Sequence, residues 1–370
     1  MLRLTLNLEL DIDALVEVVV RRFKRKEKVV HPPRDHKDGR VECYLGSLVH
    51  VINVYERCAH ACSYCYVEWK HSPPTIVAHE NLLERVLRDL KKFYIGRKVV
   101  LNLGSATDPY QPIEEKLKHT RKLVKLLKEC NLTFYLCTKS NLILRDLDLY
   151  KGYENVWIGV SLTSLDEEFS RVFEPNTPNP KARLNLVKRL IDAGIPVVVR
   201  VSPIIPMVND KPDWLEETIS ELAKIGVEKV TADILKLDRS KIMFYGWENM
   251  PKWKTPLKNS LKTWSNITGK NNLEDKLEKL YYRDGETLYG YVVPPISYRF
   301  KVLSLVKNAC VKYGLKFSTC RMRVDIKYKL NSWIENGKFR CACYMKNPVK
   351  VRFKKIREAE ESLKKIKIED

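Results

Sequence analysis

The chain has 370 residues, 44% of them hydrophobic and 31% charged, enough to bury at least one sizeable core. Lys and Arg outnumber Asp and Glu by 67 to 46, and this one-sided net charge of +21 favours a polyanionic partner, with nucleic acid first. The ten cysteines are too sparse for a disulfide framework, and neither a secretion signal nor a stretch of membrane-spanning length is evident. We therefore expect a cytoplasmic protein without a membrane partner.

The first 48 residues read as an N-terminal extension. Leucines alternate with polar residues over positions 2–10, a period of two that predicts a half-buried strand outside the main fold. A basic run follows at 21–26, and its simplest interpretation is a solvated surface. Phosphate contact is the alternative.

Three cysteines, Cys58, Cys62 and Cys65, follow the first buried run at C-x3-C-x2-C spacing. Thiolates on one short loop can converge on an iron–sulfur cluster, because soft sulfur ligands suit iron. A [4Fe–4S] cluster has four iron atoms, so this loop leaves one iron without a local cysteine and able to bind another ligand. A zinc knuckle is the alternative, but zinc usually takes four ligands in C-x2-C pairs, and no second pair lies nearby.

Residues 49–238 alternate between apolar runs and helical patterns. The apolar runs predict strands, and the intervening segments show helical periodicity. The predicted strands are 49–54, 99–103, 133–137, 156–162, 196–201 and 230–235, and the helices include 81–93, 114–129, 181–193 and 214–225. Such alternation predicts an α/β fold with a parallel sheet, whose functional residues gather where the strands end.

Residues 239–370 form a predicted C-terminal subdomain with helices at 300–313 and 350–368. Its aromatic residues lie among lysines; packing of a small core is the favoured interpretation, and stacking on bases the alternative. Four cysteines here could hold a second iron–sulfur cluster or a zinc ion, although one lies on an apolar helix face and the spacing fits no standard pattern. These are Cys310, Cys320, Cys341 and Cys343.

Five ordered motifs resemble the radical S-adenosylmethionine (SAM) superfamily, within it the spore photoproduct lyase-like group often called "DNA repair photolyase". They are the cysteine loop, 103–112, 138–146, 160–163 and 201–206. The resemblance implies a partial (β/α)6 barrel, a [4Fe–4S] cluster and SAM. It also implies reductive cleavage of SAM to a 5′-deoxyadenosyl radical that abstracts hydrogen from substrate, with an external electron donor such as ferredoxin or flavodoxin.

The resemblance also assigns site residues. It implies that Tyr64 and Tyr66, flanking Cys65, contact adenine or relay a hydrogen atom. The predicted SAM-binding residues are Gly104, Ser105, Lys139, Ser161 and Arg200. Lys139 would pair with the SAM carboxylate. Asp108 is expected to cap the turn at Pro109.

One departure from the group bears on substrate. Spore photoproduct lyase carries a hydrogen-donating cysteine near the position of Gly104 and Ser105, and this chain has none there. Cys137 could offer a thiol, although a buried inert thiol is the favoured interpretation. The sequence therefore predicts a radical SAM enzyme, lyase or transferase, acting on DNA or tRNA. The alternatives are a radical SAM enzyme for a small phosphorylated metabolite or a peptide, and a non-catalytic nucleic-acid-binding protein with a structural metal.

Overall fold

The computed structural model describes most of the chain. The described residues are 2–4, 18–22, 24, 27–31, 49–65, 75–239, 256–288, 290–319, 334–335, 338–339 and 349–369. Tyr66, Cys320, Cys341 and Cys343 lie outside these ranges, as do Trp247, Trp253 and Tyr289 of the predicted aromatic region. Within the described residues, no helix combines the length and apolarity that a bilayer crossing needs.

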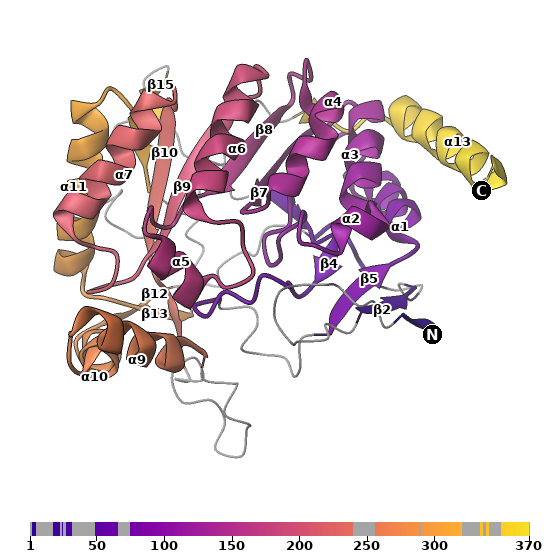
Figure 1. Ribbon diagram of the computed structural model, residues 1–370. Helices are drawn as coiled ribbons and strands as arrows, with labels where there is room; N and C mark the ends of the chain where they lie inside the picture. Colours follow the sequence, from indigo (N-terminus) through magenta and orange to yellow (C-terminus); the bar gives the residue numbers. More distant parts are fainter. Residues whose placement is uncertain are drawn as a thin grey trace.

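A curved parallel sheet forms the centre of the fold, with helices along its outer side (Figure 1). Neighbouring strands pair in the order β3, β6, β7, β8, β9, β10, β14, and every pair is parallel. Their bounds are β3 Val49–Ile52, β6 Lys98–Leu103, β7 Thr133–Thr138, β8 Val156–Ser161, β9 Val197–Ile204, β10 Lys229–Ile234 and β14 Lys316–Ser318. The α/β class is confirmed and the arrangement is compatible with a partial barrel, which β14 extends beyond the six expected strands.

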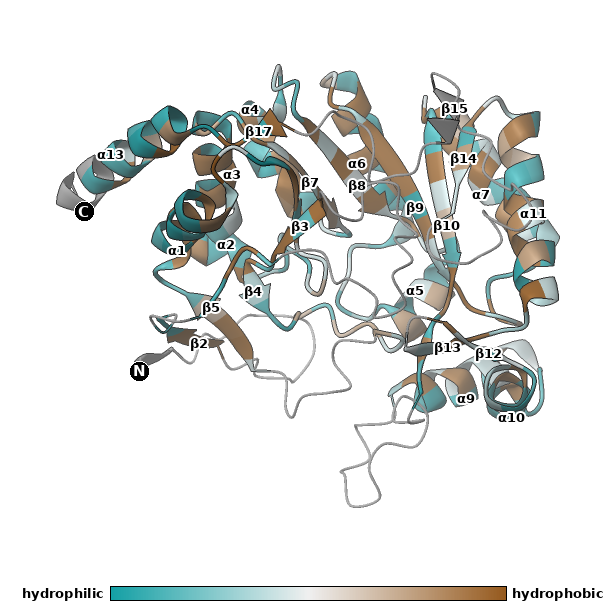
Figure 2. Cartoon of the chain, turned by 180° about the vertical axis from the view of Figure 1, so that it is seen from behind, coloured by the Kyte–Doolittle hydropathy of each residue, from teal (hydrophilic) through white to brown (hydrophobic). Residues whose placement is uncertain are grey.

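Alternate residues of these strands face opposite sides of the sheet. Phe134 and Leu136 of β7 join the large core under the helices, whereas Tyr135 packs with Trp157 and Val198 on the inner side. The helices of the outer layer are α1 Leu82–Asp89 with its continuation η2 Leu90–Tyr94, α3 His119–Glu129, α6 Pro180–Asp192, α7 Pro212–Lys224 and α11 Ile296–Lys312. Because most residues of these strands are buried on both faces, their sequences are mainly apolar, as the largely brown colour of β9 in Figure 2 shows.

The helix predicted over 114–129 is broken in two. Lys118 adopts a left-handed conformation (φ 54°) between α2 Glu114–Leu117 and α3. The Glu114 carboxylate accepts hydrogen bonds from the backbone N–H groups of Thr120 (2.8 Å) and Arg121 (3.1 Å). A buried side chain thus caps the start of α3, a contact that helical periodicity does not reveal.

The N-terminal strand is confirmed over β1 Leu2–Leu4, which pairs antiparallel with β2 Val18–Arg21. These strands do not stand apart from the rest of the chain. They share a second sheet, in the order β1, β2, β5, β4, with β5 Ile76–His79 and β4 Tyr55–Glu56. The described strands β1 and β2 therefore belong to the same sheet as β4, the strand that leads into the cysteine loop.

The C-terminal region builds a second core and covers one sheet edge. Trp264 of α9 Pro256–Thr268 packs against Phe169 and Phe173 of α5 Glu167–Phe173, and Tyr281 is buried in the same core. These aromatics therefore pack a core, as the favoured interpretation predicted. The remaining elements are β11 Leu237–Asp238, α10 Leu273–Glu278, η5 Lys279–Arg283, β12 Glu286–Leu288, β13 Tyr291–Val293, β15 Ile334–Glu335, β16 Lys338–Phe339, β17 Val349–Lys350 and α13 Phe353–Glu369. Strand β17 pairs antiparallel with β6.

Candidate active site

The three cysteines lie on one coiled loop after β4. Cys58, Cys62 and Cys65 are all partly buried, and the Cys65 N–H donates to the Cys62 carbonyl oxygen at 2.9 Å. Two non-glycine residues of the loop, Arg57 (φ 67°) and Ala61 (φ 48°), adopt left-handed conformations. Such conformations are costly for L-residues, so the surrounding contacts must hold the loop in this shape.

Those contacts come from two neighbouring loops. The Gln111 side chain accepts from Ala59 N–H (2.8 Å) and donates to the Arg57 carbonyl (2.9 Å). On the other side, the Asn176 amide donates to the Ala59 carbonyl at 3.0 Å. The Ser63 N–H donates to the carbonyl of Phe173 at 2.9 Å. The loop is thus fixed by polar groups that follow β6 and α5.

The thiols sit in surroundings that oppose their ionisation. Burial, and then the charge of Asp108, raises the pKa of Cys58 well above its usual value. Burial raises the pKa of Cys62 to about 12, although the nearby Lys139 cation acts in the opposite direction. Thiolates in such a place need added positive charge, which iron supplies. The donor set and its burial therefore fit an iron–sulfur cluster held by Cys58, Cys62 and Cys65.

A single metal ion fits the described residues less well. No group of three His, Cys, Asp or Glu side chains among them could hold one ion. In an iron–sulfur cluster each cysteine binds a different iron, so the three sulfur atoms need not converge on one point.

Lys139 lies directly after β7 and beside the cysteine loop. Its ammonium group is 3.9 Å from Oε1 of Glu174 and 5.6 Å from the centre of the Tyr64 ring. Burial alone would lower the pKa of Lys139, but the charges of Cys62 and Glu174 outweigh it and the pKa is raised. Lys139 is therefore a cation next to Cys62, a position suited to pairing with an anion bound there.

Glu174 balances this cation from the other side. It is almost completely buried, and its Oε2 lies 2.5 Å from Nη2 of the equally buried Arg183. Burial by itself would raise the pKa of Glu174, but the charges of Arg183 and Lys139 and the hydrogen bonds that it accepts lower it to about 2. The pair is thus ionised at neutral pH.

Tyr64 points into this buried cluster. Its hydroxyl donates to Oε1 of Glu174, which also accepts from the Thr163 hydroxyl at 2.6 Å. Its ring is 7% exposed and packs with Phe169 and Phe173. These contacts anchor the cysteine loop, and an adenine contact for Tyr64 stays a prediction.

Gly104 and Ser105 occupy the turn after β6. Gly104 has φ +80°, and a Cβ there would lie 2.5 Å from the Thr107 carbonyl oxygen and 2.7 Å from Cδ of Pro109. The turn itself therefore requires glycine, whether or not a ligand approaches. Ser105 is an exposed residue of this turn.

Ser161 and Arg200 lie side by side, at paired positions of β8 and β9. Arg200 directs its guanidinium toward Asp233 on β10, with Nη2 3.4 Å from Oδ2. The Ser161 carbonyl accepts from Nη1 of Arg183 at 3.2 Å. The structure thus gathers the predicted residues at neighbouring strands of one sheet, and their roles toward SAM stay predictions.

The predicted second metal site is described only at Cys310. This side chain of α11 is fully buried in the large hydrophobic core, and burial raises its pKa to about 12. Its surroundings are those of a hydrophobic core residue. The other three cysteines of that prediction, like Tyr66, lie outside the described residues.

Sequence reasoning missed several residues of the site. Glu174, Arg183 and His60 were not singled out, and Asp108 was expected only to cap a turn. One signal was available for His60, which lies midway between Cys58 and Cys62. The Glu174–Arg183 pair carries no signal in the sequence, because only the tertiary fold brings the two side chains together.

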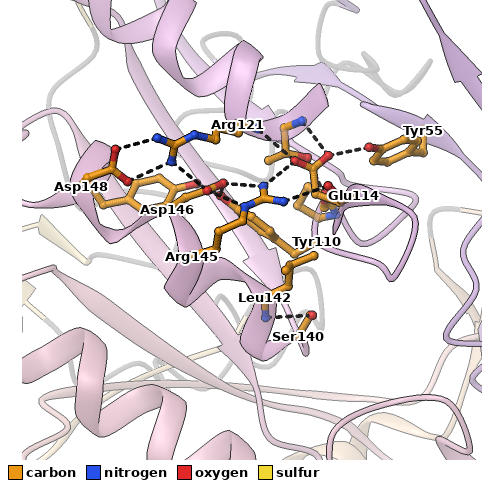
Figure 3. Close-up of polar contacts among 12 residues, drawn as sticks. Tyr55, Tyr110, Glu114, Arg121, Ser140, Leu142, Arg145, Asp146 and Asp148 are labelled. Atoms are coloured by element: carbon orange, nitrogen blue, oxygen red, sulfur yellow. Dashed lines mark hydrogen bonds and ion pairs between the residues drawn. The ribbon is translucent and has the colours of Figure 1, made fainter. Parts of the chain in front are cut away.

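A second charged network includes Glu114, Arg121 and Arg145 (Figure 3). The Arg145 guanidinium donates to Oε1 of Glu114 (2.9 Å) and to both carboxylate oxygens of Asp146 (2.7 and 2.8 Å). Arg121 bridges Asp146 and Asp148, with contacts of 2.8–2.9 Å. Glu114 and Asp146 are fully buried. This network joins the loop after β6 to η3 Asn141–Asp146, which follows Lys139.

Comparison with known proteins agrees with this geometry. Residues 52–222 match the radical SAM superfamily. Uncharacterized proteins of Acidianus two-tailed virus and Methanocaldococcus jannaschii are both 32% identical, over 197 and 177 residues. The matches cover 48% and 46% of this chain, and 64% and 65% of those relatives. The chain thus matches less than two thirds of each relative's length.

Solved structures of spore photoproduct lyase share the fold. One, complexed with dinucleoside spore photoproduct, superposes with a TM-score of 0.56 at 15% identity, covering 82% of both chains. Another, a mutant with bound AdoMet and dinucleoside spore photoproduct, gives 0.52 at 16% identity over 72% of this chain and 75% of that chain. The predicted resemblance is confirmed: residues 52–222 match the radical SAM superfamily, and the fold is similar to that of spore photoproduct lyase.

Proposed function

We propose that this protein is a radical SAM enzyme that binds a [4Fe–4S] cluster through Cys58, Cys62 and Cys65 and acts on nucleic acid. The observation that carries the proposal is the cysteine loop itself: three partly buried thiols, two with raised pKa values, beside the Lys139 cation. When bound, the cluster supplies the electron that cleaves SAM to a 5′-deoxyadenosyl radical, which abstracts hydrogen from substrate.

The chain's own residues would bind and orient SAM. Lys139 offers a cation for the SAM carboxylate, and the hydroxyl of the exposed residue Ser105 offers a hydrogen bond to its amino or carboxylate group. Ser161 and Arg200 extend this polar surface onto β8 and β9. A small electron-transfer protein, such as a ferredoxin or flavodoxin, would deliver the electron.

Two observations support nucleic acid as the substrate class. The net charge of +21 favours a polyphosphate partner. Solved spore photoproduct lyases of similar fold bind a dinucleoside lesion. A small phosphorylated metabolite or a peptide is the second candidate, since Lys139 and Arg200 would suit any anionic substrate equally well. We keep the choice between lyase and transferase chemistry open to experiment.

Anaerobic reconstitution tests the chemistry. Wild-type protein reduced with dithionite and given SAM should release 5′-deoxyadenosine, and Cys62→Ala should abolish both the release and most of the bound iron. Cys130→Ala is the matched control, because Cys130 is buried in the apolar core at the end of α3 and should leave both unchanged. Absence of 5′-deoxyadenosine from fully loaded wild-type protein would refute the proposal.

Salt dependence tests the substrate class. Binding of tRNA or single-stranded DNA should weaken steeply between about 50 and 200 mM salt if several phosphate contacts form, because each contact releases counterions. A flat response would favour the small-molecule or peptide candidate.

A further inference from the structure

Asp108 connects three segments of the site through one buried carboxylate. Its Oδ1 accepts from the Tyr110 N–H (2.8 Å) and the Thr138 hydroxyl (2.7 Å). Its Oδ2 accepts from the backbone N–H of Lys139 at 2.8 Å and lies 3.2 Å from Nε2 of His60. The side chain of Asp108 is only 8% exposed.

Capping a turn explains only one of these contacts. An aspartate that stabilises the turn at Pro109 needs the bond to the Tyr110 N–H, two residues on. The other three groups belong to different parts of the chain: Thr138 and Lys139 at the end of β7, and His60 in the cysteine loop. Asp108 therefore connects the loop after β6 to two other segments that carry predicted site residues.

His60 completes the connection from within the cysteine loop. Its ring is 3% exposed, and Nδ1 lies 2.7 Å from the carbonyl oxygen of Asn176, to which it donates. The other ring nitrogen faces Asp108. The ring thus lies between the loop after α5 and the loop after β6. Its two contacts hold His60, and with it the part of the cysteine loop between Cys58 and Cys62, in place.

We infer that Asp108 and His60 are positioning residues that hold the Lys139 backbone and the cysteine loop in one fixed relation. This inference rests on the proposed function. The Asp108 carboxylate reaches Lys139 through its backbone, so the lysine side chain stays available to contact an anion. The pair thereby keeps the Lys139 cation beside Cys62, where the carboxylate of SAM would need it. Displacement of either segment would weaken SAM binding, whereas the three cysteines could still bind the cluster.

Asp108→Asn is the sharpest variant. Asparagine retains one carbonyl oxygen, which can still accept from Tyr110 and Thr138, but its NH2 group cannot accept from the Lys139 N–H. We expect iron content near that of wild type, SAM affinity lowered by about 10- to 100-fold, and loss of the change that SAM causes in the electron paramagnetic resonance spectrum of the reduced cluster. Asp148→Asn, in a carboxylate 56% exposed, is the matched control and should behave as wild type.

Thr138→Val covers the case in which Asp108→Asn does not fold. It removes a single hydrogen bond to Asp108, so the expected loss of SAM affinity is smaller, about 3- to 10-fold. Wild-type SAM affinity in both folded variants would overturn the inference, and so would loss of iron from Asp108→Asn, since the pair would then hold the cluster rather than Lys139. If cluster-loaded wild-type protein binds no SAM, the proposed function itself fails, and the variants are not needed to show it.

Discussion

The two buried charge networks on either side of the loop after β6 differ in how completely they are paired. In the Glu114 network, the carboxylates of Glu114 and Asp146 have close donors at 2.7–3.1 Å, supplied by Arg145, Arg121 and backbone N–H groups. Around the cysteines, Glu174 is closely paired with Arg183 (2.5 Å), but Lys139 lies 3.9 Å from the Glu174 carboxylate, and burial raises the pKa of two thiols. The first network is fully paired and acts as a structural support, whereas the second suits the proposed binding of positively charged iron and an anionic ligand.

Arg145→Met should have the largest effect on stability, because it leaves the buried Glu114 carboxylate without a guanidinium partner and Asp146 with Arg121 as its remaining guanidinium. We expect the free energy of unfolding to fall by about 4 kcal/mol, as for other broken buried ion pairs. Chemical denaturation of the iron-free protein measures this loss. Arg145→Lys keeps the charge but not the paired N–H donors, so its free energy of unfolding should lie between those of wild type and Arg145→Met. A loss below about 1 kcal/mol would show that the network is not a structural support.

Glu174→Gln should reduce the free energy of unfolding by about 3 kcal/mol at neutral pH, since the pKa of Glu174 in the folded protein is about 2 against a usual value of 4.5. The folded pKa is lowered, so this contribution is complete above about pH 5 and declines as the pH falls from there toward 2. Denaturation of both proteins across this range should show their difference shrinking with acidification. A difference independent of pH would contradict the assignment of an ionised Glu174.

Gly159→Ala probes the inner side of the sheet. The added Cβ would lie 2.4 Å from Sγ of Cys137 and 3.3 Å from the Leu136 carbonyl oxygen. We expect a loss of about 2 kcal/mol from overpacking. Adding Cys137→Ala removes the sulfur and should recover part of the loss, which a double-mutant cycle would measure as coupling. Additive effects of the two substitutions would mean that the thiol does not fill this space.

Asp148→Asn should have the smallest effect. Asp148 pairs with Arg121 at the exposed end of the Glu114 network, where both side chains are well hydrated. We expect a change within about 0.5 kcal/mol in the free energy of unfolding. A larger loss would mean that the complete network extends to the protein surface.

The sequence alone determined the α/β class, the approximate bounds of six parallel strands and the position of the cysteine loop. These features are local: a strand buried on both faces needs a continuous apolar run, and thiolate ligands on one loop need a fixed spacing. The predicted strand at 133–137, for example, is β7 Thr133–Thr138. A family resemblance that rests on short ordered motifs can likewise be recognised from the sequence alone.

Only the tertiary structure decided which side chains meet. Tyr64 binds Glu174, 110 residues away, and Asp108 binds the backbone of Lys139 on the neighbouring strand. The predicted helix breaks at Lys118, where the Glu114 side chain caps the start of α3, and the seventh strand β14 is recognisable only once it pairs with β10. Such pairings depend on which strands become neighbours, and a buried charge is stable only where that arrangement supplies its partner.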